Sequence, residues 1–403
     1  MRKAIFWIHL SVGVVAGLVI LIMSVTGVLL MYQRQITNWT DGISVQPPAG
    51  SASRLPVETL LQKVTETVSG TPTAMTISSD PATAASFSYG REKTVFVDPY
   101  TGTILGYGSK RVRAFFQFMI DWHRWLGMSG EKRELGKAIT GVCNLGFLFL
   151  VLSGIYLWWP RNWSVRSLKA ITLFDGSLKG KARDWNWHNV IGIWSAIPLA
   201  IVAFTAIFFS YPWANEWLYK ATGETPPARP NPLGAPGTAG TARASGENRG
   251  SRESRENKSE QKIAIAGLND SWVRAEQQIP GWRTINLRIP TSEKAPLVFT
   301  IDRGNGARPD LRAQLTLNAK NGEVEKQETY EGYSPARKIR LWVRWLHTGE
   351  AGGWIGQTIA GLASAGGAVL VWTGISLALR RFFKRKASSE AVPAVTEEAV
   401  STR

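Results

Sequence analysis

The residues best suited to carry chemistry in this chain are its four histidines, His9, His123, His188 and His347. Each lies at or beside the end of a long apolar segment, and the sequence has no other histidine. Histidine is costly near the core of a bilayer unless it is paired or ligated, so this distribution needs a chemical reason. Neutral imidazole is the usual protein ligand of haem iron, and four such ligands would suit two haems with two axial histidines each.

The elements that must position these histidines are four apolar segments. Each reaches the roughly 20 residues needed to cross a bilayer and has no charged residue in its central part, so each is predicted to be a transmembrane helix. The first begins after a short basic stretch and is too long for the apolar region of a signal peptide, so we expect an uncleaved anchor. The segments are Ala4–Met31, Ala138–Trp159, Val190–Phe209 and Ile355–Leu379.

Basic residues predict the orientation of these helices. They gather in the start Met1–Lys3, in the loop 160–187 and in the tail after Leu379, three segments that alternate correctly for one side of the membrane. We therefore expect both termini in the cytoplasm of a bacterial cell, with the long segments after the first and third helices in the periplasm. The net charge of +17 reflects this rule and contacts with membrane lipid, so no nucleic-acid partner is expected.

The two halves of the chain repeat one another around the histidines. His9 and His188 are each followed at +4 by a glycine, and at +17 and +18 by Thr26-Gly27 and Thr205-Ala206. The second and fourth apolar segments align at an offset of 220, which pairs three glycines and places Ser153 opposite Thr373. His123 and His347 lie in corresponding tryptophan-rich amphipathic stretches before these segments.

The segments outside the membrane repeat as well. The stretch TVFVDPYTGTILG from Thr94 reads as strand, turn and strand, and QLTLNAKNGEVEK from Gln314 aligns with it, again at an offset of 220. A helical pattern precedes each one. The sequence therefore predicts an α-helical integral membrane protein with four transmembrane helices, arranged as two parallel-related repeats that each carry a small extracytoplasmic α+β domain.

The predicted boundaries follow from this repeat. They are a first transmembrane helix at 4–32, a periplasmic domain at 33–108, an interfacial amphipathic helix at 109–128, a second transmembrane helix at 134–159, a basic cytoplasmic loop at 160–187, a third transmembrane helix at 188–212, a disordered periplasmic linker at 225–262, a second periplasmic domain at 263–330, an interfacial helix at 335–349, a fourth transmembrane helix at 353–380 and a cytoplasmic tail at 381–403.

This topology predicts how the histidines pair. His9 and His188 open outward-going helices and form an inner pair, whereas His123 and His347 precede inward-going helices and form an outer pair. About 17 residues of helix span roughly 25 Å, so a pair made across the two depths would have to bridge most of the membrane. Two axial histidines fill the iron coordination and favour electron transfer over oxygen binding. The small residues at +4 and +8 from His9 and His188 are expected to leave room for the macrocycle.

Other roles for the histidines stay open from the residues alone. They are anchoring at the interface among tryptophans, binding of zinc or copper, and proton relay. No carboxylate or thiolate accompanies a histidine at a convincing metal-ligand spacing. Four histidines in repeat-related places, with none elsewhere, favour haem.

The remaining features bear on how haem is held and reduced. The only cysteine, Cys143, lies in an apolar segment as a packing residue, and no C-x-x-C-H motif occurs, so both haems are expected to be non-covalent b-type groups. Arg124 and Arg344 flank the outer histidines and are candidate contacts for the haem propionates. No glycine-rich dinucleotide motif is present, so electrons are expected from quinol or from a redox protein.

These motifs together resemble the PepSY-associated transmembrane family. The residues that carry the resemblance are RKAIFWIHL at the start, the VFVDPYTGTILG hairpin, DWHRWLG, WNWHNVIGIW and RWLHTG. The resemblance covers nearly the whole chain apart from the linker and tail. It implies PepSY-like outer domains and a multi-pass, di-haem oxidoreductase of the bacterial inner membrane, which passes electrons outward to the iron of a ferric siderophore and so promotes iron release.

Three functional hypotheses follow. The first is a ferric-siderophore reductase, an enzyme of electron and ion transport that works with periplasmic iron-chelating or iron-binding proteins. The second is a non-enzymatic membrane sensor or scaffold whose outer domains bind a peptide or a periplasmic partner. The third is a haem reductase for another acceptor, such as a periplasmic redox protein or copper.

Overall fold

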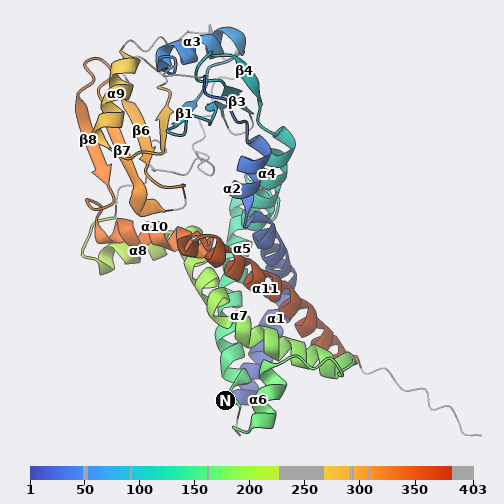
Figure 1. Ribbon diagram of the computed structural model, residues 1–403. Helices are drawn as coiled ribbons and strands as arrows, with labels where there is room; N and C mark the ends of the chain where they lie inside the picture. Colours follow the sequence, from blue (N-terminus) through green and yellow to red (C-terminus); the bar gives the residue numbers. More distant parts are fainter. Residues whose placement is uncertain are drawn as a thin grey trace, which may run out of the picture.

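The computed structural model has a bundle of long helices at one end and a β-sheet layer at the other (Figure 1). It describes residues 1–48, 53–90, 93–160, 163–226, 267–290, 292, 295–306 and 308–383. In these residues four helices are long and apolar enough to cross a membrane. They are α1 (Arg2–Leu30), α5 (Lys132–Trp158), α7 (Gly180–Ser210) and α11 (Gly353–Phe382).

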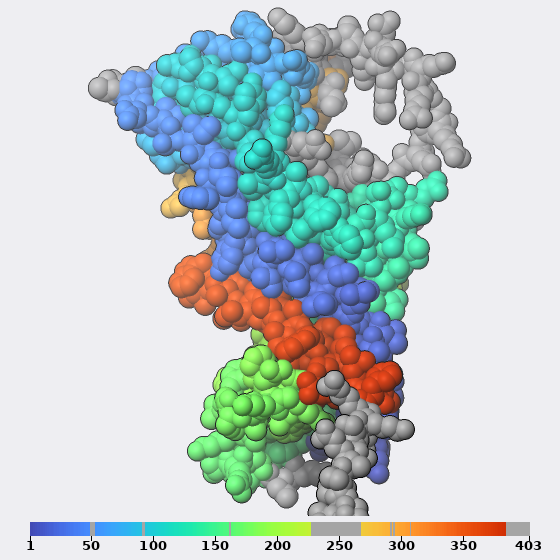
Figure 2. Space-filling view, turned by 90° about the vertical axis from the view of Figure 1, so that its right-hand side faces the viewer, coloured from blue at the N-terminus to red at the C-terminus, as the bar shows by residue number. Residues whose placement is uncertain are grey.

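The four long helices pack as a ring. α1 contacts α5 and α11, and α7 contacts the same two helices. Figure 2 shows α1 in blue and α11 in red lying against each other across one face. Small residues bring the helices close, because a Cβ added at Gly17 of α1 would already touch Val371 and Ile375 of α11 at 3.4 Å.

A single eight-stranded antiparallel sheet lies beyond one end of this bundle. Its strand order is β4-β3-β2-β1-β5-β6-β7-β8. The sequence predicted two small domains, and the structure joins their strands edge to edge, because β1 pairs with β5 from Ala74↔Arg288 to Ser78↔Thr284. The strands are β1 (Ala74–Ser78), β2 (Ala85–Tyr89), β3 (Lys93–Val97), β4 (Ile104–Tyr107), β5 (Thr284–Arg288), β6 (Leu297–Asp302), β7 (Arg312–Leu317) and β8 (Val324–Thr329).

One face of the sheet carries its hydrophobic core. Helices α3 (Val57–Thr67) and α9 (Leu268–Gln278) contact each other and pack on the buried residues of both halves. Burial alternates along most strands, as in β7, where Ala313, Leu315 and Leu317 are buried and their neighbours are not. This alternation is the period expected of strands with one covered face.

Shorter helices connect the sheet to the bundle. α2 (Gln33–Asp41) almost continues α1, and α4 (Lys110–Trp125) packs on α1 and α5. In the second half α8 (Pro212–Ala221) follows α7, and α10 (Pro335–His347) packs on α7. Ser109 and Ser334 cap α4 and α10 by accepting from backbone N–H groups three residues later.

Several observed boundaries differ from the expected ones. α7 begins at Gly180, well before the expected start at 188, and the loop 160–187 also contains α6 (Val165–Thr172). The polar start of α7 is helical because its Asp184 is buried and bonded to α11. The predicted linker 225–262 and tail 381–403 lie outside the described residues, except for 225–226 and 381–383.

Candidate functional site

Each of the four histidines bonds a serine or threonine hydroxyl of another helix through Nδ1. His9 on α1 and His188 on α7 bond hydroxyls on α5 and α11, whereas His123 on α4 and His347 on α10 bond hydroxyls on α1 and α7. The partners occupy the repeat-related positions seen in the sequence. The distances are 2.8 Å to Ser153 from His9, 3.0 Å to Thr26 from His123, 2.9 Å to Thr373 from His188 and 3.2 Å to Thr205 from His347.

These hydroxyls determine which imidazole nitrogen carries the proton. Each hydroxyl donates its single hydrogen to the backbone carbonyl four residues earlier in its own helix, at 2.6 to 2.8 Å. Its oxygen must then accept the hydrogen bond from the imidazole, which makes Nδ1 the N–H donor. The lone pair is left on Nε2 in all four histidines. A neutral imidazole with a free Nε2 and a bonded Nδ1 is the form that ligates metal.

The outer pair, His123 and His347, comes together in the structure. The two ring centroids are 6.5 Å apart, with an interplanar angle of 63°. Two metal–imidazole bonds of about 2 Å and the distances from nitrogen to ring centre would separate the centroids of two axial ligands by roughly 6.4 Å. Burial, helped by the charge of His347, lowers the pKa of His123 to about 4, so this imidazole is neutral at pH 7. The observed separation fits one metal ion between the two rings.

The inner pair lies at the opposite end of the bundle, where α1 and α7 begin. His9 and His188 interact electrostatically, and each rests beside a glycine of the helix that supplies its hydroxyl. A Cβ added at Gly154 would lie 3.6 Å from Cε1 of His9, and one at Gly374 would lie 3.4 Å from Cε1 of His188. Gly27 has the same relation to His123, at 3.4 Å. The glycine after each of these three hydroxyls therefore lets the imidazole approach the helix.

The donor set fits haem better than a metal bound by protein alone. Within the described ranges no three His, Cys, Asp or Glu side chains gather in a way that could hold a metal ion. Two imidazoles supply only two ligands, whereas a structural zinc site takes four. A porphyrin supplies the four equatorial nitrogens and needs only two axial ligands from the protein. Two imidazoles that each present Nε2 match that need.

The small residues expected to make room for the macrocycle also lie at contacts between helices. A Cβ at Gly13 would contact Leu150, and one at Gly192 would contact Leu370, at 3.8 and 3.7 Å. Gly17 and Ala196, at +8, are buried against neighbouring helices. These positions serve helix–helix packing, because close helices need small side chains at the contact.

The two arginines proposed as propionate contacts occupy different surroundings. The guanidinium of Arg124 lies over the ring of Trp125, 4.6 Å from its centroid, and interacts electrostatically with both outer histidines. Arg344 interacts with Glu350 and with two further arginines, Arg312 and Arg34. Arg124 is thus beside the outer pair, whereas Arg344 belongs to a cluster between the bundle and the sheet.

Two kinds of residue near the histidines were not assigned a role from the sequence. The hydroxyls of Thr26, Ser153, Thr205 and Thr373 were visible only as matched positions in the repeat. Asp184, fully buried, accepts a hydrogen bond from Ser376 at 2.7 Å and pairs with Arg183 and Arg380. Its signal was an acidic residue one helical turn before His188 in an otherwise basic stretch.

Comparison with known proteins identifies the family of the chain. No curated protein matches the chain. The family model described as the PepSY-associated TM region matches residues 6–381, which include all four histidines and all but the outermost residues of the four long helices. The chain is therefore a membrane protein that belongs to the PepSY-associated transmembrane family.

Proposed function

We propose that this protein is a di-haem electron-transfer protein that reduces ferric siderophores. The observation that carries the proposal is the set of four imidazoles with Nδ1 bonded and Nε2 left for a ligand. His9 and His188 would hold one non-covalent b-type haem, and His123 and His347 a second. Each haem, when bound, supplies a one-electron carrier.

The chain's own residues hold and orient these two groups. The hydroxyls set the tautomer and the ring orientation, which prepares each imidazole for iron without a further rearrangement. On α1 the inner ligand His9 and the outer hydroxyl Thr26 are about 17 residues apart, or roughly 25 Å along the helix. The histidines at these two depths would hold two haems, which would supply an electron path between the two sides of a membrane.

The direction of transfer follows from the basic segments of the sequence. They favour the bacterial inner membrane with both termini in the cytoplasm and the sheet in the periplasm. Electrons would enter the inner haem from quinol or a redox protein and leave from the outer haem. One electron converts one ferric ion to a ferrous ion, which the hard oxygen ligands of a siderophore hold less well. A periplasmic iron-chelating or iron-binding protein would then take the ferrous ion.

A reduced-minus-oxidised spectrum with haem quantification tests the proposal. Wild type should contain two low-spin haems per chain, and alanine at any one of the four histidines should remove the haem of that pair alone. Asn189→Ala is the matched control, because Asn189 neighbours His188 and bonds only within its own helix. The reduced protein should then be reoxidised by a ferric siderophore.

Two outcomes would favour the other hypotheses. Purified protein without low-spin haem bands would overturn haem ligation and favour a sensor or scaffold that binds a peptide or partner. Protein with two haems that a ferric siderophore does not reoxidise would favour another acceptor, such as a redox protein or copper.

A further inference from the structure

Three arginines from three separate elements converge where the sheet meets the bundle. Arg34 comes from α2, Arg312 from the start of β7 and Arg344 from α10, and Arg344 interacts electrostatically with both of the others. Arg312 donates to the carbonyl of Gly306 at 2.7 Å, and a Cβ added at Gly306 would lie 3.3 Å from Nη1 of Arg34 and 3.5 Å from Nη2 of Arg312. We refer to Arg34, Arg312 and Arg344 as the junction cluster.

The junction cluster carries more positive than negative charge. Arg312 donates to Asp302 at 2.8 Å, and Arg34 lies 3.6 Å from Glu350, so in the part of the chain that the structure describes these ion pairs bring two carboxylates to three guanidinium groups. Burial and then the like charges of Arg312 and Arg34 lower the pKa of Arg344, although Glu350 opposes this shift. Crowding of like charge is unfavourable, and an added anion would offset it.

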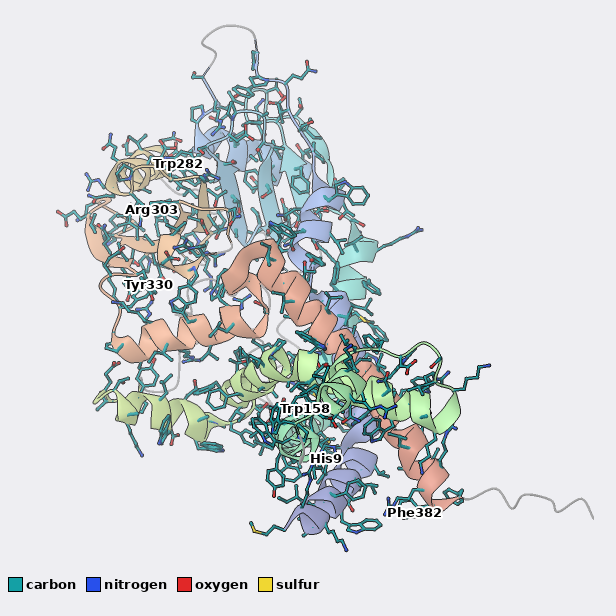
Figure 3. All side chains as sticks on the ribbon, turned by 60° about the horizontal axis from the view of Figure 1, so that its bottom comes forward. His9, Trp158, Trp282, Arg303, Tyr330 and Phe382 are labelled. Carbon is teal, nitrogen blue, oxygen red and sulfur yellow. The ribbon has the colours of Figure 1, made fainter. Side chains whose placement is uncertain are left out.

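The junction cluster lies between the bundle and the sheet and comes within one helical turn of one outer histidine, His347. Arg344 is one helical turn before His347 in α10, and the guanidinium of Arg312 lies over the ring of the intervening Trp345, 5.5 Å from its centroid. The connection between β6 and β7 carries Gly306 to this place, and Figure 3 labels Arg303 at its start. The corresponding connection in the first half, between the end of β2 at Tyr89 and the start of β3 at Lys93, is shorter.

We propose that the junction cluster binds the acceptor, and that the acceptor is therefore a negatively charged ferric chelate. Carboxylate or other oxyanion groups of the chelate would accept hydrogen bonds from Arg34 and Arg312, because guanidinium matches such groups in charge and geometry. This placement would hold the iron near the outer pair. The inference rests on the proposed function and specifies that the electron acceptor is an anionic ferric chelate.

Binding and reduction are measured separately so that the two proposals can fail separately. The binding probe is gallium–EDTA, an anionic and redox-inert chelate, titrated calorimetrically into the full-length protein. The reduction probes are anionic ferric–EDTA and uncharged ferrichrome. The variants are Arg34→Gln and the conservative Arg34→Lys, with Arg274→Gln as the control. Arg274 bonds the carbonyl of Gly322 in the sheet domain, away from the junction.

In Arg34→Gln we expect gallium–EDTA to bind about tenfold more weakly and the KM for ferric–EDTA to be about tenfold higher. A change of this size corresponds to the loss of one charged hydrogen bond. Ferrichrome kinetics, haem content and kcat should not change in this variant. Arg34→Lys should recover part of the loss, and Arg274→Gln should match wild type.

Two outcomes would overturn the inference. One is the absence of gallium–EDTA binding to wild type. The other is a loss of haem in Arg34→Gln without a change in chelate selectivity, since the cluster would then hold the haem propionates. Binding of gallium–EDTA without reduction of any chelate would refute only the reductase.

Discussion

The inner and outer histidine pairs use the same chemical unit in two different structural settings. The inner histidines belong to the long helices α1 and α7, and their hydroxyls come from α5 and α11. The outer histidines belong to the shorter helices α4 and α10, and their hydroxyls come from α1 and α7. The bundle alone therefore builds the inner site, whereas the outer site also depends on how α4 and α10 dock.

This difference links the outer pair to the sheet. Glu328 of β8 pairs with Arg337 of α10, whereas Arg113 of α4 pairs with Asp41 of the helix α2. The inner pair has no comparable link to the sheet, but Asp184 ties α7 to α11 one turn from His188. A shift of the sheet would therefore act on α10 and His347 through the Glu328–Arg337 pair before it acts on the inner pair.

The largest effect is expected when a histidine ligand is removed. Removal of an inner and of an outer histidine should affect different steps, electron entry and electron exit. In His188→Ala the outer haem should remain and be reduced by dithionite, but a quinol donor should no longer reduce it. In His347→Ala the inner haem should still accept electrons from quinol and should fail to pass them to the chelate. Stopped-flow spectroscopy with each donor measures both steps. Equal behaviour of the two variants would contradict the assignment of an inner entry and an outer exit.

Removal of a hydroxyl should have the next largest effect and should differ between the pairs. His9 has Ser153 as its hydrogen-bond partner, whereas Nδ1 of His347 also lies 3.0 Å from the carbonyl of Val202. Ser153→Ala should therefore weaken haem binding about 10- to 100-fold, and Thr205→Val should weaken it less. Haem titration of the apoprotein and the midpoint potential of each haem are the measurements. Similar losses in both variants would mean that the carbonyl does not substitute for the hydroxyl.

Asp184→Asn should produce a smaller loss, limited to the inner end. The variant weakens the bonds that Asp184 accepts from Arg183, Ser376 and Arg380. Because both arginines are partly exposed to solvent, we expect the unfolding free energy to fall by only about 1–3 kcal/mol. Thermal unfolding in detergent, followed at the absorbance of each haem, should show the inner site lost at a lower temperature. Asp175→Asn is the control, because Asp175 is exposed and bonds Ser177 locally. An equal shift at both sites would contradict a local effect.

The smallest expected effect is a pH dependence of the link between the sheet and α10. Burial alone would raise the pKa of Glu328, but hydrogen bonds from Arg337 and Lys326 outweigh it and hold the pKa below 4.5. The stabilisation is therefore present above about pH 4.5 and is lost as the pH falls through the lowered pKa. Its size is about 0.5–1 kcal/mol, so the protection factors of the α10 amides, which correct for the pH dependence of intrinsic exchange, should fall about two- to fivefold in acid. Glu328→Gln should have equal protection factors at both pH values, and those of α5 should not change.

Most elements near the membrane were predictable because their signals are local. The four apolar segments predicted the four long helices to within a few residues at most ends, and the amphipathic stretches around His123 and His347 predicted α4 and α10. The start of α7 was predicted too late because polar residues around Asp184 read as a loop. Burial of one carboxylate against another helix is a tertiary effect that no local pattern reports.

Sequence alone was sufficient for the number and identity of the imidazoles, for their division between two depths and for the matched positions of the four hydroxyls, because periodicity and repeat spacing are properties of the chain itself. Which atoms meet was decided by the tertiary structure. The hydroxyl–imidazole bonds join residues 97 to 185 positions apart, and the β1–β5 pairing that makes one sheet of two halves joins residues still farther apart in the sequence. Contacts of that range depend on how complete elements pack, so the tautomer of the histidines and the junction cluster became visible only in the fold.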